Sequence, residues 1–156
     1  MQSTKSVKYG FLAGVGAVAY ILLFYFFSPR LMLSSVVLWS SLAIYLVAMW
    51  MAARRALEVG SELTPFREAL KAAFTVFVVA NLLYYCFYYL LFTVIDPGLI
   101  DLQRELLAER LEWIGNPQFQ PKDLQVTLGN TFLSYCWSLI GGFLLAALTA
   151  ALASRI

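Results

Sequence analysis

The sequence contains no histidine, and four long stretches of it contain no Asp, Glu, Lys or Arg. These stretches are residues 9–27, 31–53, 72–95 and 131–153. Coupled transporters normally place an ionisable side chain inside the membrane, because some group must change charge during the transport cycle. Acid–base catalysis likewise requires positioned titratable groups. We therefore expect neither a coupled transporter nor an enzyme, and we expect no catalytic residue, metal site or cofactor.

Cysteine and net charge are also low. The two cysteines, Cys86 and Cys136, lie inside uncharged stretches at different expected depths, so a structural disulfide is not expected. The net charge is only +2, and the basic residues are not interleaved with aromatic residues as they are on surfaces that bind nucleic acid. The sequence therefore predicts no nucleic-acid partner.

Hydrophobic residues are abundant instead. They make up 62% of the chain, while charged residues make up 13%, compared with about a quarter of a soluble domain. A helix rises about 1.5 Å per residue, and the hydrocarbon core of a bilayer is about 30 Å thick, so about 20 apolar residues cross it. Each uncharged stretch is long enough. We predict a single transmembrane domain over residues 1–156, an all-α, integral membrane four-helix bundle.

Turn and cap residues divide the chain between these stretches. Pro29 breaks the chain between the first two, and Thr64-Pro65 is typical of a helix start. Asp96-Pro97 repeats the start signal before residues 97–114, where leucines fill one half of a helical wheel and acids line a narrow arc of the other. The pattern predicts an extracytoplasmic amphipathic helix that lies along the membrane surface or over the mouth of the bundle. Its acids are Asp101, Glu105, Glu109 and Glu112.

The distribution of basic residues predicts the orientation of the chain. With four spans, both termini and the second loop lie on one side of the membrane. Because segments rich in Lys and Arg remain in the cytoplasm, the more basic side is the cytoplasmic one, and we expect both termini there. That side holds seven of the eleven basic residues: Lys5, Lys8, Arg54, Arg55, Arg67, Lys71 and Arg155.

Small residues recur at four-residue spacing along the last uncharged stretch, and a similar pair occurs in the first. Small side chains allow transmembrane helices to approach each other closely. The pattern therefore indicates either packing within one chain or an interface with a second copy or another membrane protein, and both alternatives stay open. The residues are Ser134, Ser138, Gly142, Ala146 and Ala150 in the last stretch, and Gly10 and Gly14 in the first.

A second group combines one amide with several phenols near the middle of the spans. Polar groups in hydrocarbon need partners, because an unpaired one costs several kcal/mol. The group predicts either hydrogen bonds between helices or the wall of a cavity for a lipid or an amphipathic small molecule. Its members are Asn81, Tyr84, Tyr85 and Tyr88 in the third stretch, with Tyr20 and Tyr45 at comparable depth in the first two.

The order of these parts resembles that of a bacterial membrane family known as domain of unknown function 4199. The matching pieces are Lys8-Tyr9-Gly10 at the first span, the sequence FREALK at residues 66–71, Asp96-Pro97 after the third span, and the acidic helix before the fourth. The resemblance implies a four-helix protein of the bacterial inner (cytoplasmic) membrane. It implies no assigned activity and no catalytic residues.

These observations favour a non-enzymatic multi-pass membrane protein with an accessory or scaffold role. Such a protein would associate with itself or with another membrane protein through the small-residue faces. The alternative is a small protein that binds or moves a lipid or lipid-linked substrate in a tyrosine-lined intramembrane cavity, with the amphipathic helix as its lid. Membrane lipid is an expected partner in either case.

Overall fold

The computed structural model describes residues 2–59, 64–115 and 126–156, and this part of the chain is helical and contains no strand. Four helical segments are long and apolar enough to cross a membrane: Thr4–Phe27, Ser35–Val59, Pro65–Ile95 and Leu128–Arg155. The predicted fold class is therefore confirmed. The helices are α1 (Gln2–Phe27), α2 (Pro29–Met32), α3 (Ser35–Val59), α4 (Pro65–Leu90), the π-helical η1 (Leu91–Ile95), α5 (Leu99–Ile114) and α6 (Leu128–Arg155).

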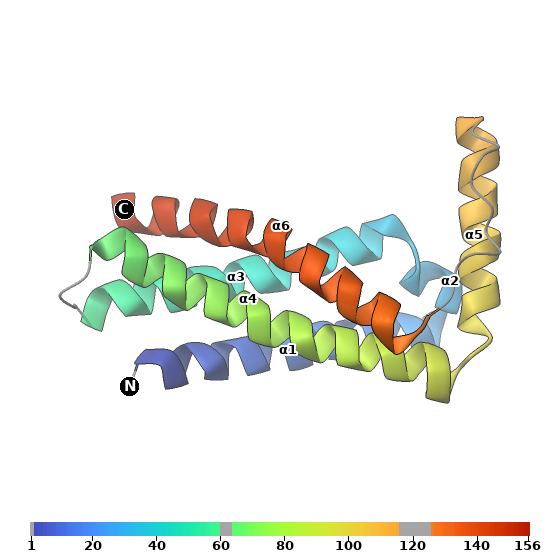
Figure 1. The fold of residues 1–156 in the computed structure, drawn as a ribbon, viewed down its shortest axis with the longest axis horizontal. Helices are drawn as coiled ribbons and strands as arrows, with labels where there is room; N and C mark the ends of the chain where they lie inside the picture. Colours follow the sequence, from blue (N-terminus) through green and yellow to red (C-terminus); the bar gives the residue numbers. More distant parts are fainter. Residues whose placement is uncertain (1, 60–63, 116–125) are drawn as a thin grey trace.

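The four long helices, α1, α3, α4 and α6, lie side by side as a bundle (Figure 1). The N-terminus and the C-terminus lie at the same end of this bundle. At the opposite end, α5 lies crosswise to the long helices and extends past them. If the bundle crosses a membrane, α5 therefore runs along the membrane surface.

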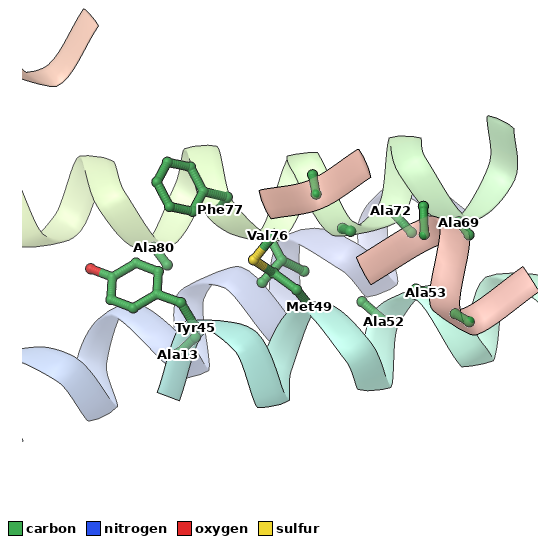
Figure 2. Packing of buried hydrophobic residues seen from close by; sticks show 14 of the residues in the cluster. Ala13, Tyr45, Met49, Ala52, Ala53, Ala69, Ala72, Val76, Phe77 and Ala80 are labelled. Carbon is green, nitrogen blue, oxygen red and sulfur yellow. The ribbon is translucent and has the colours of Figure 1, made fainter. Parts of the chain in front are cut away.

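α4 is the central helix, in contact with α1, α3 and α6. Its buried face is mostly alanine, and Figure 2 shows it against Met49 and Tyr45 of α3 and Ala13 of α1. Helices in lipid associate through close packing, and small side chains bring their backbones together. The small side chains of α4 therefore explain why this helix packs against three others. Glu68 and Asn81 of α4 are buried as well, and its buried hydrophobic residues are Ala69, Ala72, Ala73, Val76, Phe77 and Ala80.

The outward faces of the long helices are apolar as well. Large hydrophobic side chains are exposed along the whole bundle, whereas much of the interior is alanine. Contiguous exposed apolar surface of this extent is unusual for a protein in water. The surface is compatible with a multi-pass membrane protein. Examples are Phe11, Leu12, Leu23, Trp39, Val47, Phe132, Trp137, Leu144 and Leu148.

The second span begins later than the expected residue 31. The proline at position 29 starts only the short helix α2, and α3 begins at Ser35 after a turn. Ser34 Oγ accepts a hydrogen bond of 3.4 Å from the backbone N–H of Val37, which supplies a partner to the first turn of α3. α4 begins at Pro65, where the Thr64-Pro65 signal predicts a helix start. α1 begins before residue 9, because charged residues end a hydrophobic stretch without ending a helix.

Candidate functional site

A cavity of about 440 Å³ lies beneath α5, where α4 approaches the crosswise helix. Its walls combine aromatic and aliphatic side chains with a few hydrogen-bonding groups, the usual composition of a small-molecule site. α4 contributes Tyr84, Tyr85 and Tyr88. α5 contributes Gln103, Leu106, Leu107 and Arg110, and the remaining lining residues are Leu33, Leu38 and Ser134.

The three tyrosines form one ring cluster because Tyr88 lies four residues from Tyr84 and three from Tyr85 on α4. The ring centroids of Tyr84 and Tyr85 are 5.3 Å apart, and those of Tyr84 and Tyr88 are 6.2 Å apart. Tyr85 also contacts Tyr135 of α6, with 5.9 Å between centroids. The cavity thus has a continuous aromatic wall formed by α4.

One tyrosine of this wall joins α4 to α5 directly. The hydroxyl of Tyr88 donates a hydrogen bond of 3.3 Å to Oε1 of Gln103. Arg110, two turns further along α5, is the single charged residue among the described side chains that line the cavity. A guanidinium in the same lining as hydroxyl and amide groups gives the cavity a positive edge and suits an anionic or strongly polar group.

Several contacts hold α5 in place over the cavity. One guanidinium nitrogen of Arg30 lies 2.8 Å from each carboxylate oxygen of Glu109, which ties α5 to the segment between α1 and α3. The hydroxyl of Tyr25 donates a hydrogen bond of 3.0 Å to Asp96 at the corner before α5. Leu99, at the start of α5, is buried against a cluster at this end of the bundle. α5 therefore covers the cavity, and contacts with the bundle hold both its start and its second half.

A separate apolar groove of about 430 Å³ lies between α4 and α6. Tyr85 lines both this groove and the cavity, so its side chain forms the boundary between the two spaces. The groove is lined almost entirely by apolar and aromatic side chains. They are Leu82, Cys86, Tyr89, Leu90, Leu128, Thr131, Phe132 and Tyr135, together with Tyr85.

The other polar candidates from the sequence lie apart from the cavity lining. The amide of Asn81 donates a hydrogen bond to Ser138 Oγ on α6, and Asn81 is buried. Tyr20 and Ser40 share a hydrogen bond of 2.7 Å between α1 and α3. Tyr45 is buried with its ring centroid 5.7 Å from that of Phe77. The structure therefore brings Tyr84, Tyr85 and Tyr88 together in the cavity wall. Asn81, Tyr20 and Tyr45 lie behind this wall and make contacts between helices, and Asn81 shares the partner Ser138 with Tyr85.

Most of the small residues lie inside the bundle. A Cβ atom added to Gly10 would lie 2.8 Å from Cβ of Val79, and one added to Gly14 would lie 2.7 Å from Cδ1 of Leu83. Both glycines thus fit α1 closely against α4. On α6, Gly142, Ala146 and Ala150 are buried, Ser138 bonds to Asn81, and Ser134 is exposed and lines the cavity.

A family model described as a protein of unknown function (DUF4199) matches residues 8–155. The chain belongs to this family. The match spans every long helix, α5 and the cavity between them, so the cavity lies within the DUF4199 domain. No curated protein and no solved structure matches the chain.

Sequence reasoning missed the α5 side of the cavity in this DUF4199 protein. Gln103, Leu106, Leu107 and Arg110 are spaced at i, i+3, i+4 and i+7, which places them on one helix face. That spacing can be read from the sequence. A helical wheel of α5 separates leucines from acids, however, and does not show that Gln103 and Arg110 face a cavity. Leu33 and Leu38 carried no signal, because their place depends on the turn between α2 and α3.

Proposed function

We propose that this protein is a non-enzymatic, multi-pass protein of the bacterial inner membrane that binds a lipid or lipid-linked molecule, with both termini in the cytoplasm. The observation that carries this proposal is the tyrosine-lined cavity of about 440 Å³ beneath α5, separated by Tyr85 from an apolar groove of similar size. Sites that bind small molecules typically have volumes in this range and an apolar wall that carries a few polar groups.

The chemistry of the two spaces suits the two parts of an amphipathic ligand. The headgroup would lie in the cavity, where Tyr88, Gln103 and Arg110 offer hydroxyl, amide and guanidinium groups. An acyl or isoprenoid chain would lie in the groove between α4 and α6, whose lining is apolar. The side chain of Tyr85 would contact the ligand where its polar and apolar parts meet.

The small-residue faces give less support to the accessory or scaffold role. Gly10, Gly14, Gly142, Ala146 and Ala150 are buried by neighbouring helices of the same chain. Side chains that already fill contacts within the bundle offer no free surface to a second protein. The arrangement therefore favours the cavity over these faces as the site of function.

Native mass spectrometry of the full chain, extracted with its lipids, tests this function. We expect a retained lipid, and about thirtyfold less of it after Tyr85 and Tyr88 are both changed to Phe. The reason is that two hydroxyls, each contributing about 1 kcal/mol through a hydrogen bond, are lost while the rings remain. The matched control is Tyr20→Phe, which removes a hydroxyl bonded to Ser40 away from the cavity.

Either of two results would contradict the proposal. The first is a wild-type protein that carries no lipid after extraction and takes up none from added lipid mixtures. The second is equal lipid retention by wild type, Tyr20→Phe and the cavity double variant. A lipid-free wild-type protein that migrates as a stable oligomer would support the scaffold role instead.

A further inference from the structure

A third pocket lies near the ends of α1 and α3. That end of the bundle carries both termini and is far from α5 (Figure 1). The pocket lies between the first turns of α1 and the last turns of α3 and has a volume of about 170 Å³. The cavity beneath α5 shares none of its residues. Its role is therefore independent of the function proposed above.

The lining of this pocket combines apolar side chains with charged ones, and the charged ones give it a net positive charge. Lys5 and Arg55 supply two cations, and Glu58 supplies one carboxylate. The guanidinium of Arg55 lies 5.9 Å from the centre of the Tyr9 ring, so the ring supports one face of the cation. Two guanidinium N–H groups suit a phosphate well, because they can bind two of its oxygens at once.

Small side chains provide the space between the two helices. Ala52 and Ala56 of α3 and Ser6 of α1 line the pocket and are buried. The volume of about 170 Å³ equals that of roughly six water molecules, at about 30 Å³ each. A phosphate group with its four oxygens fits such a space.

The position of the pocket along the helices matches the headgroup layer of a membrane. Lys5 and Arg55 lie within one turn of the ends of α1 and α3, at Gln2 and Val59. Each helix has at least 25 residues, which is more than the roughly 20 needed to cross the hydrocarbon core. Their ends therefore extend into the headgroup region, and exposed apolar side chains such as Leu12 and Met51 follow further along the same helices toward the core.

We propose that this pocket binds the phosphate group of an anionic membrane lipid, with Lys5 and Arg55 as the binding residues. The apolar flanks of α1 and α3 favour a lipid over a free phosphate ion, because acyl chains can lie along them. Anionic lipids are attracted to basic segments at this level of a membrane. The lipid would hold α1 against α3 at the end opposite to α5.

The experiment measures lipid binding to the purified full chain by native mass spectrometry, with phosphatidylglycerol, phosphatidylcholine or inorganic phosphate added separately. We expect wild type to retain phosphatidylglycerol over phosphatidylcholine. Changing Lys5 and Arg55 together to Gln should lower phosphatidylglycerol binding about tenfold or more, since both cations that contact the phosphate are lost. Both side chains are exposed, so the fold should persist, which circular dichroism checks.

The matched control changes Lys8 and Arg54 to Gln. These residues lie beside the binding pair and carry the same charge, but they do not line the pocket. Unchanged phosphatidylglycerol binding by the control supports the pocket, and so does displacement of the lipid by inorganic phosphate. Equal losses in both double variants would overturn the proposal, because they would indicate a diffuse charge effect. Binding of inorganic phosphate without any preference for phosphatidylglycerol would overturn the lipid as occupant.

Discussion

Two adjacent glycines of α6 have opposite surroundings. A Cβ atom added to Gly142 would lie 2.0 Å from Cε1 of Phe77, whereas one added to Gly141 would have no neighbouring heavy atom within 4 Å. The ring of Phe77 therefore lies directly on the backbone of α6 at Gly142. At this single position, the distance between α4 and α6 depends on the absence of a side chain.

We predict that Gly142→Ala destabilises the protein by about 1–3 kcal/mol, because the Phe77 ring must move and the helices must separate. Unfolding in mixed micelles by a denaturing detergent measures this change. Gly141→Ala is the matched control, and it should be neutral or slightly stabilising, since alanine favours helix by about 1 kcal/mol over glycine. Equal stability of the two variants would show that the close contact contributes nothing.

At the scale of elements, the ion pair between Arg30 and Glu109 is the main polar link between α5 and the bundle in the described part of the chain. Both side chains are about half exposed, at 56% and 51%, so solvent weakens the pair. Buried apolar contacts at Leu99 hold the start of α5 independently. The middle and end of α5 should consequently open more readily than its first turn.

Removing this ion pair should loosen α5 without unfolding the protein. We predict that Arg30→Gln speeds amide hydrogen exchange in the second half of α5 roughly two- to fivefold, since an exposed pair contributes up to about 1 kcal/mol. Hydrogen exchange with mass spectrometry measures this effect, and Glu105→Gln, on the same helix, is the control. Exchanging the two charges, with Arg30→Glu and Glu109→Arg, should restore protection. A variant that exchanges as slowly as wild type would refute the link.

The sequence predicted the long helices well and the cavity only partly. Charge-free stretches identify membrane-crossing helices reliably because each helix must satisfy its own backbone in lipid. The neighbours of a side chain depend instead on how the helices pack. Tyr45 and Tyr84 looked equivalent in depth, yet Tyr45 packs against Phe77 whereas Tyr84 lines the cavity. Periodicity places a residue on a face of its helix, but it does not say what covers that face.

At the scale of the whole molecule, the two ends of the bundle differ in charge. The end with both termini carries the basic residues at the starts of α1 and α4 and at the ends of α3 and α6. The opposite end carries α5, whose acids Asp101, Glu105, Glu109 and Glu112 are all exposed. Such an asymmetry orients a chain during insertion, because basic segments stay in the cytoplasm.

Labelling of single thiols in intact cells tests this orientation. With Cys86 and Cys136 changed to Ser, one cysteine is introduced by Thr4→Cys, Ser154→Cys or Glu112→Cys. We predict that a membrane-impermeant maleimide labels only the thiol at position 112, and that disrupting the cells exposes the other two. Labelling of positions 4 and 154 but not 112 in intact cells would show the opposite orientation. Labelling of only one of positions 4 and 154 would place the termini on different sides of the membrane and contradict the proposed topology.

The π-helical turn η1 determines which way α5 faces. The N–H of Asp96 donates to the carbonyl of Leu91 at 2.8 Å, five residues back instead of four, so this turn holds one residue more than an α-helical turn. Each residue added to a regular α-helix rotates everything after it by about 100°, whereas a π-helical turn takes up one added residue within a single wider turn. Without that wider turn, the extra residue would swing Gln103 and Arg110 away from the tyrosines, even with every side chain of the cavity still encoded.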